Sequence, residues 1–451
     1  MNIHFIAIGG SIMHNLAISL NKKGHIITGS DDEIYDPARS QLEKHGLLPE
    51  KLNWNINNIK ETTDAVILGM HAKKDNPELL EARGRGIPVY SFPEFIFNES
   101  KDKKRIVIAG SHGKTSITSM IMHVLNALEY DFDYLVGARI EGFDQMTKLS
   151  DAPVIILEGD EYLSSPLDLR SKFIHYKPHV TLISGIAWDH INVFKTFDDY
   201  CQCFRDLIDS MQPDGKLIYY KNDDTLKDIV YNERNDINKS TYEAFPHAVK
   251  DGITYIIEGD EHIPLKIFGK HNMENLNAAW YICKDLGISK HDFIQKTKDF
   301  KGAAKRLEIV KKGDKSVVYK DFAHAPSKLK ASTNAVKELY PDRKLTACME
   351  LHTFSSLNKR FLDQYSNSMA LVDDPIIYIN PKYFDIKGLP RISEGELIKS
   401  FNCSKLKVYY DHKALKQYLL DIKWEMNNLL MMSSGNFNGI DIEEIADKII
   451  K

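Results

Sequence analysis

The chain has 451 residues, which is too many for one hydrophobic core and predicts about three domains. Hydrophobic residues make up 43% of it and charged residues 27%, the balance of an ordinary globular protein. The formal net charge of −4 gives no reason to expect nucleic acid or an anionic membrane as a partner, so phosphate binding would have to be local.

Cysteine usage and the N-terminal segment predict a cytoplasmic protein. The five cysteines are odd in number and scattered, and the one close pair, Cys201 and Cys203, is a lone C-x-C, so we expect reduced thiols. The first residues, MNIHFIAIGG, enter a strand without the basic region or cleavage site of a signal peptide. No apolar stretch approaches the roughly 20 residues that cross a bilayer.

Short strands and helices alternate along the chain, which predicts an α/β protein with doubly wound, mainly parallel sheets. In the first hundred residues, strands are expected at 3–8, 25–28, 65–69 and 87–90, with a helix around 77–85. The polar stretch Asn98–Lys104 is typical of a linker. These features place a Rossmann-like N-terminal domain at residues 1–98.

A second and a third unit follow this linker. Strands of the second are expected at 105–109, 154–158, 180–184 and 215–219, with others, some antiparallel, within 253–268 and a closing helix at 272–286. Beyond Gly302–Arg306, strands are expected at 316–321, 344–349, 375–379, 406–410 and 428–433. We therefore place a central domain at 104–302 and a Rossmann-like C-terminal domain at 303–451.

The loop after the strand at 105–109 is the strongest chemical signal in the chain. Its glycines allow backbone N–H groups to approach phosphate oxygens, and the start of the following helix adds positive potential. Lys114 is placed to contact the β- and γ-phosphates, and the Thr115 hydroxyl to bind Mg²⁺. Ile108 replaces the first glycine of the full G-x-x-x-x-G-K-[ST] pattern, but the strand–loop–helix setting favours a P-loop ATPase domain. The expected nucleotide-binding residues are Gly110, Ser111, His112, Gly113, Lys114, Thr115 and Ser116.

Two later segments could supply metal ligands at strand ends. Glu158 begins the acidic run E-G-D-E, whose self-repulsion would lower stability unless a cation or a basic group lay beside it. His190 follows the strand VTLIS. Each alone is more often structural, but together, in a phosphate-loop domain, they favour Mg²⁺. His175 and His179 are spaced i, i+4, but Pro178 prevents a regular helix there, so we expect no zinc pair.

The N-terminal pair Gly9-Gly10, with Asp31 about 20 residues later, is similar to a dinucleotide-binding turn. The spacing G-x-G-x-x-G is absent, which disfavours NAD. The same turn of a Rossmann-like unit can hold a different phosphorylated ligand. The residues by themselves therefore favour an ATPase-type core flanked by two α/β units, an arrangement suited to joining two substrates with ATP.

Six segments, in order, resemble motifs of the Mur ligase family, and the likeness covers essentially the whole chain. Gly110–Thr115 resembles the family's G-[ST]-[HN]-G-K-T loop, Glu158–Tyr162 its E-A-D-E segment, and Asp189-His190 its D-H pair. Gly269–Asn275 resembles G-x-H-N-x-x-N, Arg306 the arginine at the last domain boundary, and Asp321–Pro326 the loop D-[FY]-A-H-x-P.

The resemblance implies an ATP-dependent, Mg²⁺-requiring amide ligase that acts through an acyl phosphate. The carboxylate of UDP-N-acetylmuramate would attack the γ-phosphate, and an amine would then displace phosphate from the acyl group. Lys114 and Arg306, together with Mg²⁺, would spread the charge of the transferring phosphoryl group. Several relatives use a carbamylated lysine where this chain has Arg205, so we predict no carbamate.

The resemblance also implies a role for each matching residue. The catalytic residues would be Lys114, His190, Arg306 and His324, and the metal ligands would be Thr115, Glu158 and His190. The adenine would contact His271, Asn272 and Asn275, and the remainder of the nucleotide Arg306 and Asp321. The sugar nucleotide would contact Gly9, Gly10, Ser11, Ser30, Asp31 and His71.

On the acceptor side, the chain has features of two branches of the family. The segments at 30–31, 35–37, 160–162, 170–176 and 432–440 resemble a branch that adds the tripeptide L-Ala-γ-D-Glu-meso-diaminopimelate. The segments at 69–77 and 90–94 resemble the alanine-adding branch. That second branch has an H-R-Y-[ST]-R-T stretch whose arginines help to bind a small carboxylate. The chain has His352–Leu357 there, without either arginine, so we favour the tripeptide.

Three alternatives remain open from the sequence. L-Alanine could be the acceptor, or the acceptor-side substitutions could mark a nucleotide-binding regulatory homologue without turnover. An oxidoreductase would rest on Gly9, Gly10 and Asp31 alone. As partners we expect the sugar nucleotide and the acceptor, with no nucleic acid and no membrane insertion, and the oligomeric state we expect is a monomer or a weak dimer.

Overall fold

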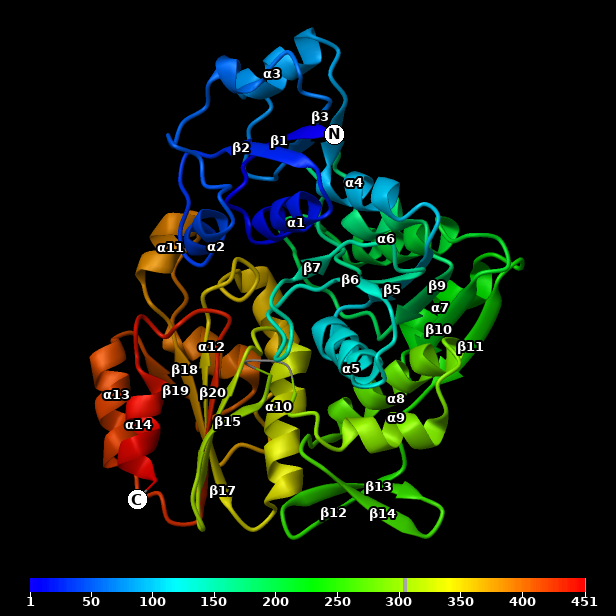
Figure 1. The fold of residues 1–451 in the computed structure, drawn as a ribbon. Helices are drawn as coiled ribbons and strands as arrows, with labels where there is room; N and C mark the ends of the chain where they lie inside the picture. Colours follow the sequence, from blue (N-terminus) through cyan, green and yellow to red (C-terminus); the bar gives the residue numbers. More distant parts are fainter. Residues whose placement is uncertain (303–305, 451) are drawn as a thin grey trace. The chain divides into compact units, whose positions relative to one another are not determined.

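The computed structural model describes residues 1–302 and 306–450 (Figure 1). The chain divides into two compact units. Unit 1 comprises Met1–Ile186 and Asp198–Tyr242, and unit 2 comprises Ala187–Phe197 and the chain from Glu243 onward. The boundary predicted near Gly302–Arg306 lies partly outside the described residues. Within the described ranges, no helix combines the length and the apolar character needed to span a bilayer.

The first sheet of unit 1 has four parallel strands in the order β2-β1-β3-β4. They are β1 (Asn2–Ile6), β2 (Ile26–Ser30), β3 (Ala65–Leu68) and β4 (Val89–Ser91). The helices are α1 (Ser11–Lys22), α2 (Ala38–Lys44), α3 (Pro77–Gly84) and α4 (Phe92–Glu99), with a short 3₁₀ turn, η1 (Ile56–Asn58). Interior strands β1 and β3 are apolar and buried, as in parallel sheets covered on both faces. The predicted alternation of strands and helices is confirmed.

The second sheet of unit 1 has the order β11-β10-β9-β5-β8-β6-β7 and is parallel except for β7. Its strands are β5 (Lys104–Ala109), β6 (Asp133–Leu135), β7 (Thr147–Lys148), β8 (Val154–Glu158), β9 (Val180–Ile183), β10 (Lys216–Tyr220) and β11 (Asn238–Tyr242). The helices are α5 (Lys114–Ala127), α6 (Phe197–Asp209), α7 (Asp224–Asn232) and the 3₁₀ helix η2 (Lys172–Tyr176). Because Ile108 pairs with Glu158, the loop after β5 begins beside the end of β8.

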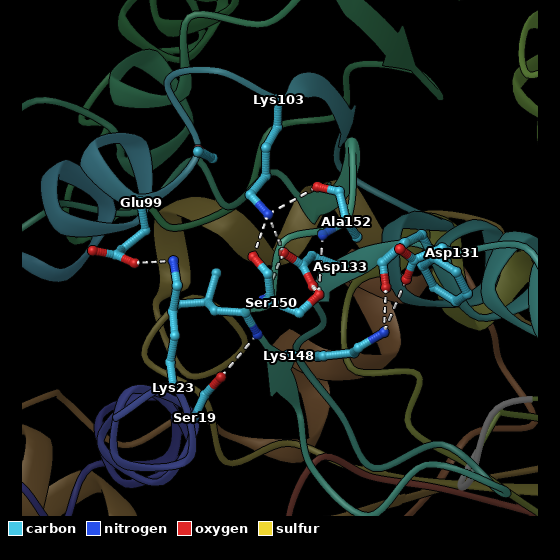
Figure 2. A network of polar contacts seen from close by, with 12 residues as sticks. Ser19, Lys23, Glu99, Lys103, Asp131, Asp133, Lys148, Ser150 and Ala152 are labelled. Atoms are coloured by element: carbon cyan, nitrogen blue, oxygen red, sulfur yellow. Dashed lines mark hydrogen bonds and ion pairs between the residues drawn. The ribbon is translucent and has the colours of Figure 1, made fainter. Parts of the chain in front are cut away.

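Polar contacts join the two sheets of unit 1 (Figure 2). Lys103, just before β5, is buried, and its Nζ donates to Asp133 Oδ2 and to the Ser150 carbonyl, each at 2.6 Å. The Ser19 hydroxyl of α1 accepts a hydrogen bond from Leu149 N at 2.9 Å. The first helix of the chain is therefore bonded to the segment that follows β7.

Unit 2 contains a three-stranded antiparallel sheet and a six-stranded sheet. The small sheet consists of β12 (His247–Lys250), β13 (Ile253–Glu258) and β14 (Glu261–Leu265). The antiparallel strands expected within 253–268 are therefore present, but they form a sheet of their own with β12. Helices α8 (Lys270–Asp285) and α9 (Lys290–Thr297) follow.

The six-stranded sheet has the order β15-β16-β20-β17-β18-β19, with β15 antiparallel to β16 and the rest parallel. Its strands are β15 (Glu308–Lys312), β16 (Val317–Asp321), β17 (Lys344–Glu350), β18 (Asp374–Tyr378), β19 (Lys407–Tyr409) and β20 (Asn427–Met432). The helices are α10 (Pro326–Leu339), η3 (Lys359–Tyr365), α11 (Lys382–Lys387), α12 (Glu394–Phe401), α13 (His412–Asp421) and α14 (Ile442–Ile449). Side chains of β16 alternate between two hydrophobic cores. Val317 and Tyr319 belong to one core, and Val318 belongs to the other. The carboxyl ends of β16, β20 and β17 meet at one edge.

Candidate active site

The loop between β5 and α5 has a backbone that requires its glycines. Gly110 has a φ of 119° and Gly113, which caps α5, a φ of 73°, both in the left-handed region. A Cβ at Gly110 would lie 2.8 Å from Ser184 N and closer still to Ser184 Oγ. No side chain caps the N-terminus of α5, and uncapped N–H groups at a helix start are suited to phosphate oxygens.

Lys114, the first residue of α5, holds its ammonium inside this loop. Nζ donates to the Gly110 carbonyl and to Glu161 Oε2, each at 2.7 Å. Burial lowers the pKa of Lys114, but the carboxylates of Glu161 and Asp160 outweigh burial, and the net shift is upward. The side chain therefore stays charged, and a nucleotide phosphate must compete with Glu161 for it.

The acidic segment E-G-D-E is compensated by lysines. Glu161 pairs with Lys114, and Asp160 Oδ2 lies 2.5 Å from Lys172 Nζ. Burial raises the pKa of Asp160, but Lys172 and Lys114 outweigh burial and hold that pKa at about 2. The sequence predicted that either a bound cation or a basic group would balance the acidic run. For Glu161 and Asp160 the balance comes from the basic groups of Lys114 and Lys172.

Glu158 is bonded instead to neutral donors and lies beside Thr115. The Thr115 hydroxyl donates to Glu158 Oε1 and the Gly137 N–H to Oε2, each at 2.7 Å. No lysine or arginine in the described part of the chain forms an ion pair with Glu158. A hydroxyl and a carboxylate oxygen are the hard ligands that Mg²⁺ prefers, so these two predicted ligands fit the ion.

Two further residues of this network were not singled out by the sequence. Tyr200 of α6 donates to Glu161 Oε1 at 3.0 Å, and its hydroxyl lies 2.8 Å from Ser111 Oγ. Glu161 could have been found as a member of the acidic run. No sequence pattern connects α6 with the glycine loop, because the fold alone brings them together.

The predicted D-H pair lies in unit 2, just before α6. The His190 N–H donates to Asp189 Oδ1 at 2.7 Å, and Lys328 Nζ lies 3.8 Å from Asp189 Oδ2. Burial raises the pKa of Asp189, but Lys328 and His190 outweigh burial and hold it at about 2. His190 has a φ of 53°, a conformation that is uncommon for residues with a side chain and recurs at functional sites. Lys328, in the first turn of α10, was not predicted.

His324 belongs to the same region of unit 2 and carries a neutral ring. Its Nδ1 lies 2.9 Å from the Phe322 carbonyl, and its own carbonyl accepts from the Tyr365 hydroxyl at 2.9 Å. Burial, aided by Lys328, lowers the pKa of His324 to about 3. In this state the ring is a hydrogen-bond partner rather than a general acid. The guanidinium of Arg306 stacks 4.9 Å from the Phe322 ring centroid.

The segment Gly269–Asn275 forms the start of α8. Its glycine has a φ of 86°, and a Cβ there would lie 2.5 Å from Ala335 Cβ of α10, so the two helices approach closely. Asn272 Nδ2 donates to a backbone carbonyl at 2.8 Å, and Asn275 is buried. Burial lowers the pKa of His271 more than the carboxylate of Asp321 raises it, so this ring is neutral.

Asp321, at the end of β16, braces the backbone around it. Its Oδ1 accepts from the N–H groups of Leu307 and Phe322, each at 2.9 Å. The Ser332 hydroxyl of α10 donates to its Oδ2. Both carboxylate oxygens are therefore engaged in holding the entry to the six-stranded sheet.

The N-terminal turn after β1 is closed by Asp31. The Gly9 N–H donates to Asp31 Oδ2 at 2.7 Å, and burial is the main cause of the raised pKa of Asp31. Gly10 caps α1 without a side-chain hydrogen bond, as in α5. Ser11 is the first, exposed residue of that helix. At this turn, the N-terminus of α1 has no side-chain cap, and the carboxylate of Asp31 lies beside it.

The remaining predicted sugar-nucleotide contacts differ in exposure. The Ser30 hydroxyl is buried and donates to Glu78 Oε2, and His4 Nε2 lies 3.2 Å from the same oxygen. A sugar nucleotide would have to replace Glu78 to bind this hydroxyl, and the predicted contact of Ser30 stays a prediction. His71, in contrast, is exposed in the loop that follows β3.

A polar cluster lies where β17 and β20 end. Glu350 is 1% exposed, its Oε2 accepts from Phe437 N at 2.9 Å and from the Ser433 hydroxyl, and its Oε1 is buried without a hydrogen bond to any described residue. His352 Nε2 lies 3.2 Å from Ser434 Oγ, and burial, opposed by Glu350, lowers the pKa of His352. The sequence missed Glu350, whose one signal is its place at a strand end.

Two family profiles match the chain, the Mur ligase middle domain over residues 108–283 and the catalytic domain of the Mur ligase family over residues 2–103. The UDP-N-acetylmuramate–L-alanine ligase of Sulfurihydrogenibium sp. (strain YO3AOP1) is 30% identical over 83% of this chain and 82% of that protein. The chain belongs to the Mur ligase family. This Mur ligase is also 29% identical to the UDP-N-acetylmuramate–L-alanine ligase of Caldanaerobacter subterraneus subsp. tengcongensis. The likeness spans 100% of this chain and 97% of that protein.

Solved structures extend the likeness to the fold of this Mur ligase. A murein peptide ligase from Psychrobacter arcticus 273-4 superimposes with a TM-score of 0.66 at 21% identity, and a UDP-N-acetylmuramate-alanine ligase from Thermotoga maritima with 0.68 at 19%. Each comparison covers 100% of this chain and 98% of the other. The predicted three-domain α/β fold is confirmed, and the chain is an ATP-dependent, amide-forming Mur ligase. The domain limits 1–98, 104–302 and 303–451 stay a prediction.

Proposed function

We propose that this Mur ligase joins the carboxylate of UDP-N-acetylmuramate to the amine of L-alanyl-γ-D-glutamyl-meso-diaminopimelate, as a murein peptide ligase of peptidoglycan recycling. Membership of the family supports the coarser reaction, ATP-dependent addition of an amino acid or a peptide to this sugar nucleotide. The tripeptide is supported by the buried carboxylate of Glu350, one oxygen of which no described residue binds.

The Glu350 cluster favours an acceptor with a positive charge remote from its nucleophile. A buried carboxylate oxygen without a partner is costly, and an ammonium group satisfies it well. L-Alanine has a single amine, which must be deprotonated to attack and cannot also serve as the bound ammonium. The tripeptide has a further amine on diaminopimelate that takes no part in the reaction. We therefore assign Glu350 to the far end of the tripeptide.

Residues of unit 1 would hold the phosphates and the sugar nucleotide. The N–H groups of residues 110–116 would bind phosphate oxygens, and Lys114 would exchange Glu161 for the β- and γ-phosphates. Thr115 and Glu158 would hold Mg²⁺, which when bound neutralises charge on the phosphate oxygens. His190, the third ligand that the family resemblance implies, stays a prediction. The sugar nucleotide would contact Gly9, Gly10, Ser11, Asp31 and His71.

Residues of unit 2 would contact the adenine and the γ-phosphate of the nucleotide, and would bind the acceptor. The adenine would contact His271, Asn272 and Asn275, and Arg306, Asp321 and His324 would form the loop that faces the γ-phosphate. The muramyl carboxylate attacks the γ-phosphorus and ADP leaves. The acceptor amine then attacks the acyl carbon, loses a proton and expels inorganic phosphate.

An acceptor screen tests this proposal. Phosphate release from ATP would be measured with UDP-N-acetylmuramate and Mg²⁺, in the presence of the tripeptide, of L-alanine or of no amine. We expect a kcat/KM for the tripeptide at least about 100-fold above that for L-alanine, because a site with an unpaired buried charge rejects a ligand that cannot pair with it. Release that is equal with and without an amine would instead indicate a regulatory homologue.

A matched pair of variants tests whether Glu350 is responsible for the preference for the tripeptide. Glu350→Gln should lower kcat/KM for the tripeptide by about tenfold or more, since a charged hydrogen bond is lost. Asp385→Asn is the control, because this exposed carboxylate of α11 pairs only with exposed Arg391 at 3.1 Å. An equal effect of the two substitutions would remove Glu350 from the acceptor site.

The second candidate function is ligation of L-alanine. It is favoured by relatives such as the Sulfurihydrogenibium enzyme, which is described as a UDP-N-acetylmuramate–L-alanine ligase. A screen in which L-alanine is the better acceptor would establish this candidate and exclude the tripeptide proposal.

A further inference from the structure

Three potential metal ligands of unit 1 lie together, and none of them is among the residues assigned to ATP. One ligand atom each of Glu94, Asp168 and His175 lies within 4.8 Å of the other two. We propose that these three residues form a binding site for a divalent transition-metal ion, with Zn²⁺ preferred. This site goes beyond the ligase reaction and does not depend on its acceptor.

The local structure presents both carboxylates in fixed positions. Glu94 closes the capping box of α4, in which Ser91 N and Ser91 Oγ donate to Glu94 Oε2 at 2.7 and 2.8 Å. Its Oε1 receives no hydrogen bond from the described residues and can turn to a ligand. Asp168 lies in a tight loop, where its N–H donates to Ser165 Oγ at 3.1 Å. Neither carboxylate therefore loses much freedom when it binds an ion.

His175 provides an independent indication of a ligand. The residue is 8% exposed, and its Nε2 is buried without a hydrogen bond to any residue that the structure describes, although Asp168 Oδ2 is 3.1 Å away. Native structures rarely leave a buried polar nitrogen in this state, so it requires an explanation. A neutral imidazole ring has a lone pair on one nitrogen that can bind a metal ion.

The donor set selects the class of ion. Imidazole nitrogen binds Zn²⁺ more tightly than it binds Mg²⁺ or Ca²⁺, and one imidazole with two carboxylate oxygens is a set that Zn²⁺ accepts, with water completing its coordination. Arg170 is the internal competitor, since its Nη2 lies 2.6 Å from Asp168 Oδ2. The Arg170 side chain is 61% exposed, so it can turn into solvent at little cost.

A bound metal ion would link Glu94 of α4 to His175 of η2. The two already pack together, since Lys172 Nζ lies 5.7 Å from the Phe92 ring centroid and Lys177 Nζ lies 5.1 Å from that of Phe97. Lys172 also holds Asp160 of the acidic segment. A bound ion would therefore stabilise unit 1 at the place where its two sheets are joined by α4.

The test is a Zn²⁺ titration of the metal-free, full-length protein without ATP, followed by competition with a chromogenic chelator and by thermal melting. Mn²⁺ and Mg²⁺ serve as comparison ions. We expect Zn²⁺ to bind most tightly and to raise the melting temperature. Glu94→Gln and His175→Ala should each weaken Zn²⁺ binding by about tenfold or more. Arg170→Gln should strengthen it several-fold, because the competitor for Asp168 is gone.

Glu99→Gln is the matched control, since this carboxylate lies on the same helix but pairs with Lys23 at 2.6 Å. Its Zn²⁺ affinity should equal that of the unsubstituted protein. The proposal is overturned if Glu94→Gln and Arg170→Gln leave the affinity unchanged, or if Arg170→Gln weakens it, as an ion-pair network without metal would require. Both substitutions are at partly exposed sites, so the test stands even if His175→Ala does not fold. Loss of ligase activity would not affect the result.

Discussion

Unit 1 contains two strand–turn–helix segments with glycine turns, and they differ in the charge that the protein itself places in the turn. After β1, the carboxylate of Asp31 accepts the Gly9 N–H. After β5, the ammonium of Lys114 lies against the Gly110 carbonyl. The first arrangement suits the hydroxyl groups of a sugar nucleotide, and the second suits polyphosphate. The two turns occupy equivalent places after a first strand, but one side chain in each gives them opposite charge.

The largest effect is expected from Lys114→Met, which removes the cation of the second turn. Turnover should fall by at least about 100-fold, because charge on the transferring phosphoryl group loses a preorganised partner. Stability should fall as well, by about 3–5 kcal/mol, since Glu161, 1% exposed, loses its ion pair with Lys114. Phosphate release and urea unfolding measure the two effects.

The double variant Lys114→Met/Glu161→Gln separates these effects. It should recover much of the lost stability but none of the turnover, because the carboxylate charge of Glu161 is removed together with the ammonium of Lys114. A single variant as stable as the parent would show that the Lys114–Glu161 pair contributes little to the fold.

Alanine in place of a glycine should affect the two turns unequally. Gly110→Ala introduces a Cβ at a φ of 119° and against Ser184, and should cost about 2–4 kcal/mol. Gly10 has a φ of −58°, and its added Cβ would lie 3.3 Å from Met13 Cγ, so Gly10→Ala should change stability by less than about 1 kcal/mol. Equal midpoints in urea would contradict this difference.

The second turn has the hydroxyl–carboxylate pair Thr115–Glu158, to which we assign Mg²⁺, so substitutions at this turn should change the response of activity to magnesium. Glu158→Gln should raise the Mg²⁺ concentration for half-maximal activity by about tenfold, since the ligand loses its charge. Asp31→Asn provides the control and should leave the Mg²⁺ dependence unchanged. A titration of activity against Mg²⁺ checks both variants, and a parallel shift in the two would refute the assignment.

The smallest effect is expected at the first turn. Because burial raises the pKa of Asp31 above its ordinary 3.8, the folded protein holds this proton more tightly than the unfolded chain. The associated stability is complete below pH 3.8 and is lost as the pH rises through the folded pKa. Asp31→Asn should abolish this loss and slightly stabilise the ligand-free protein at neutral pH. The KM for UDP-N-acetylmuramate should rise about three- to tenfold, which initial rates would show.

Features that are local in the sequence were predictable. The apolar strands RIVIA and VIILE correspond to β5 and β8, and the glycines between β5 and α5 stand where positive φ values occur. Short strands were missed, because β6 and β7, with three and two residues, are too brief to show a period. Strands β13 and β14 lie within the range 253–268, where strands, some of them antiparallel, were expected, whereas β12 (His247–Lys250) lies outside that range and was missed.

Partners distant in the sequence were not predictable. Lys114 and Glu161 are 47 residues apart and meet because β8 lies beside β5. Ser30 was expected at a ligand but is bonded to Glu78, 48 residues away, because β2 and α3 bring them together inside the domain. Glu350 was missed for the same reason, since its Ser433 partner belongs to another strand end.

The contacts around Lys103 bear on how the protein could be divided. Residues from 104 onward carry the whole nucleotide loop and suggest an autonomous nucleotide-binding fragment. A chain beginning there would leave Asp133 fully enclosed with no countercharge, and would deprive Leu149 N of the Ser19 hydroxyl. The catalytic core of unit 1 is therefore completed by the polypeptide that precedes it, and truncation at the linker should yield aggregated rather than folded material.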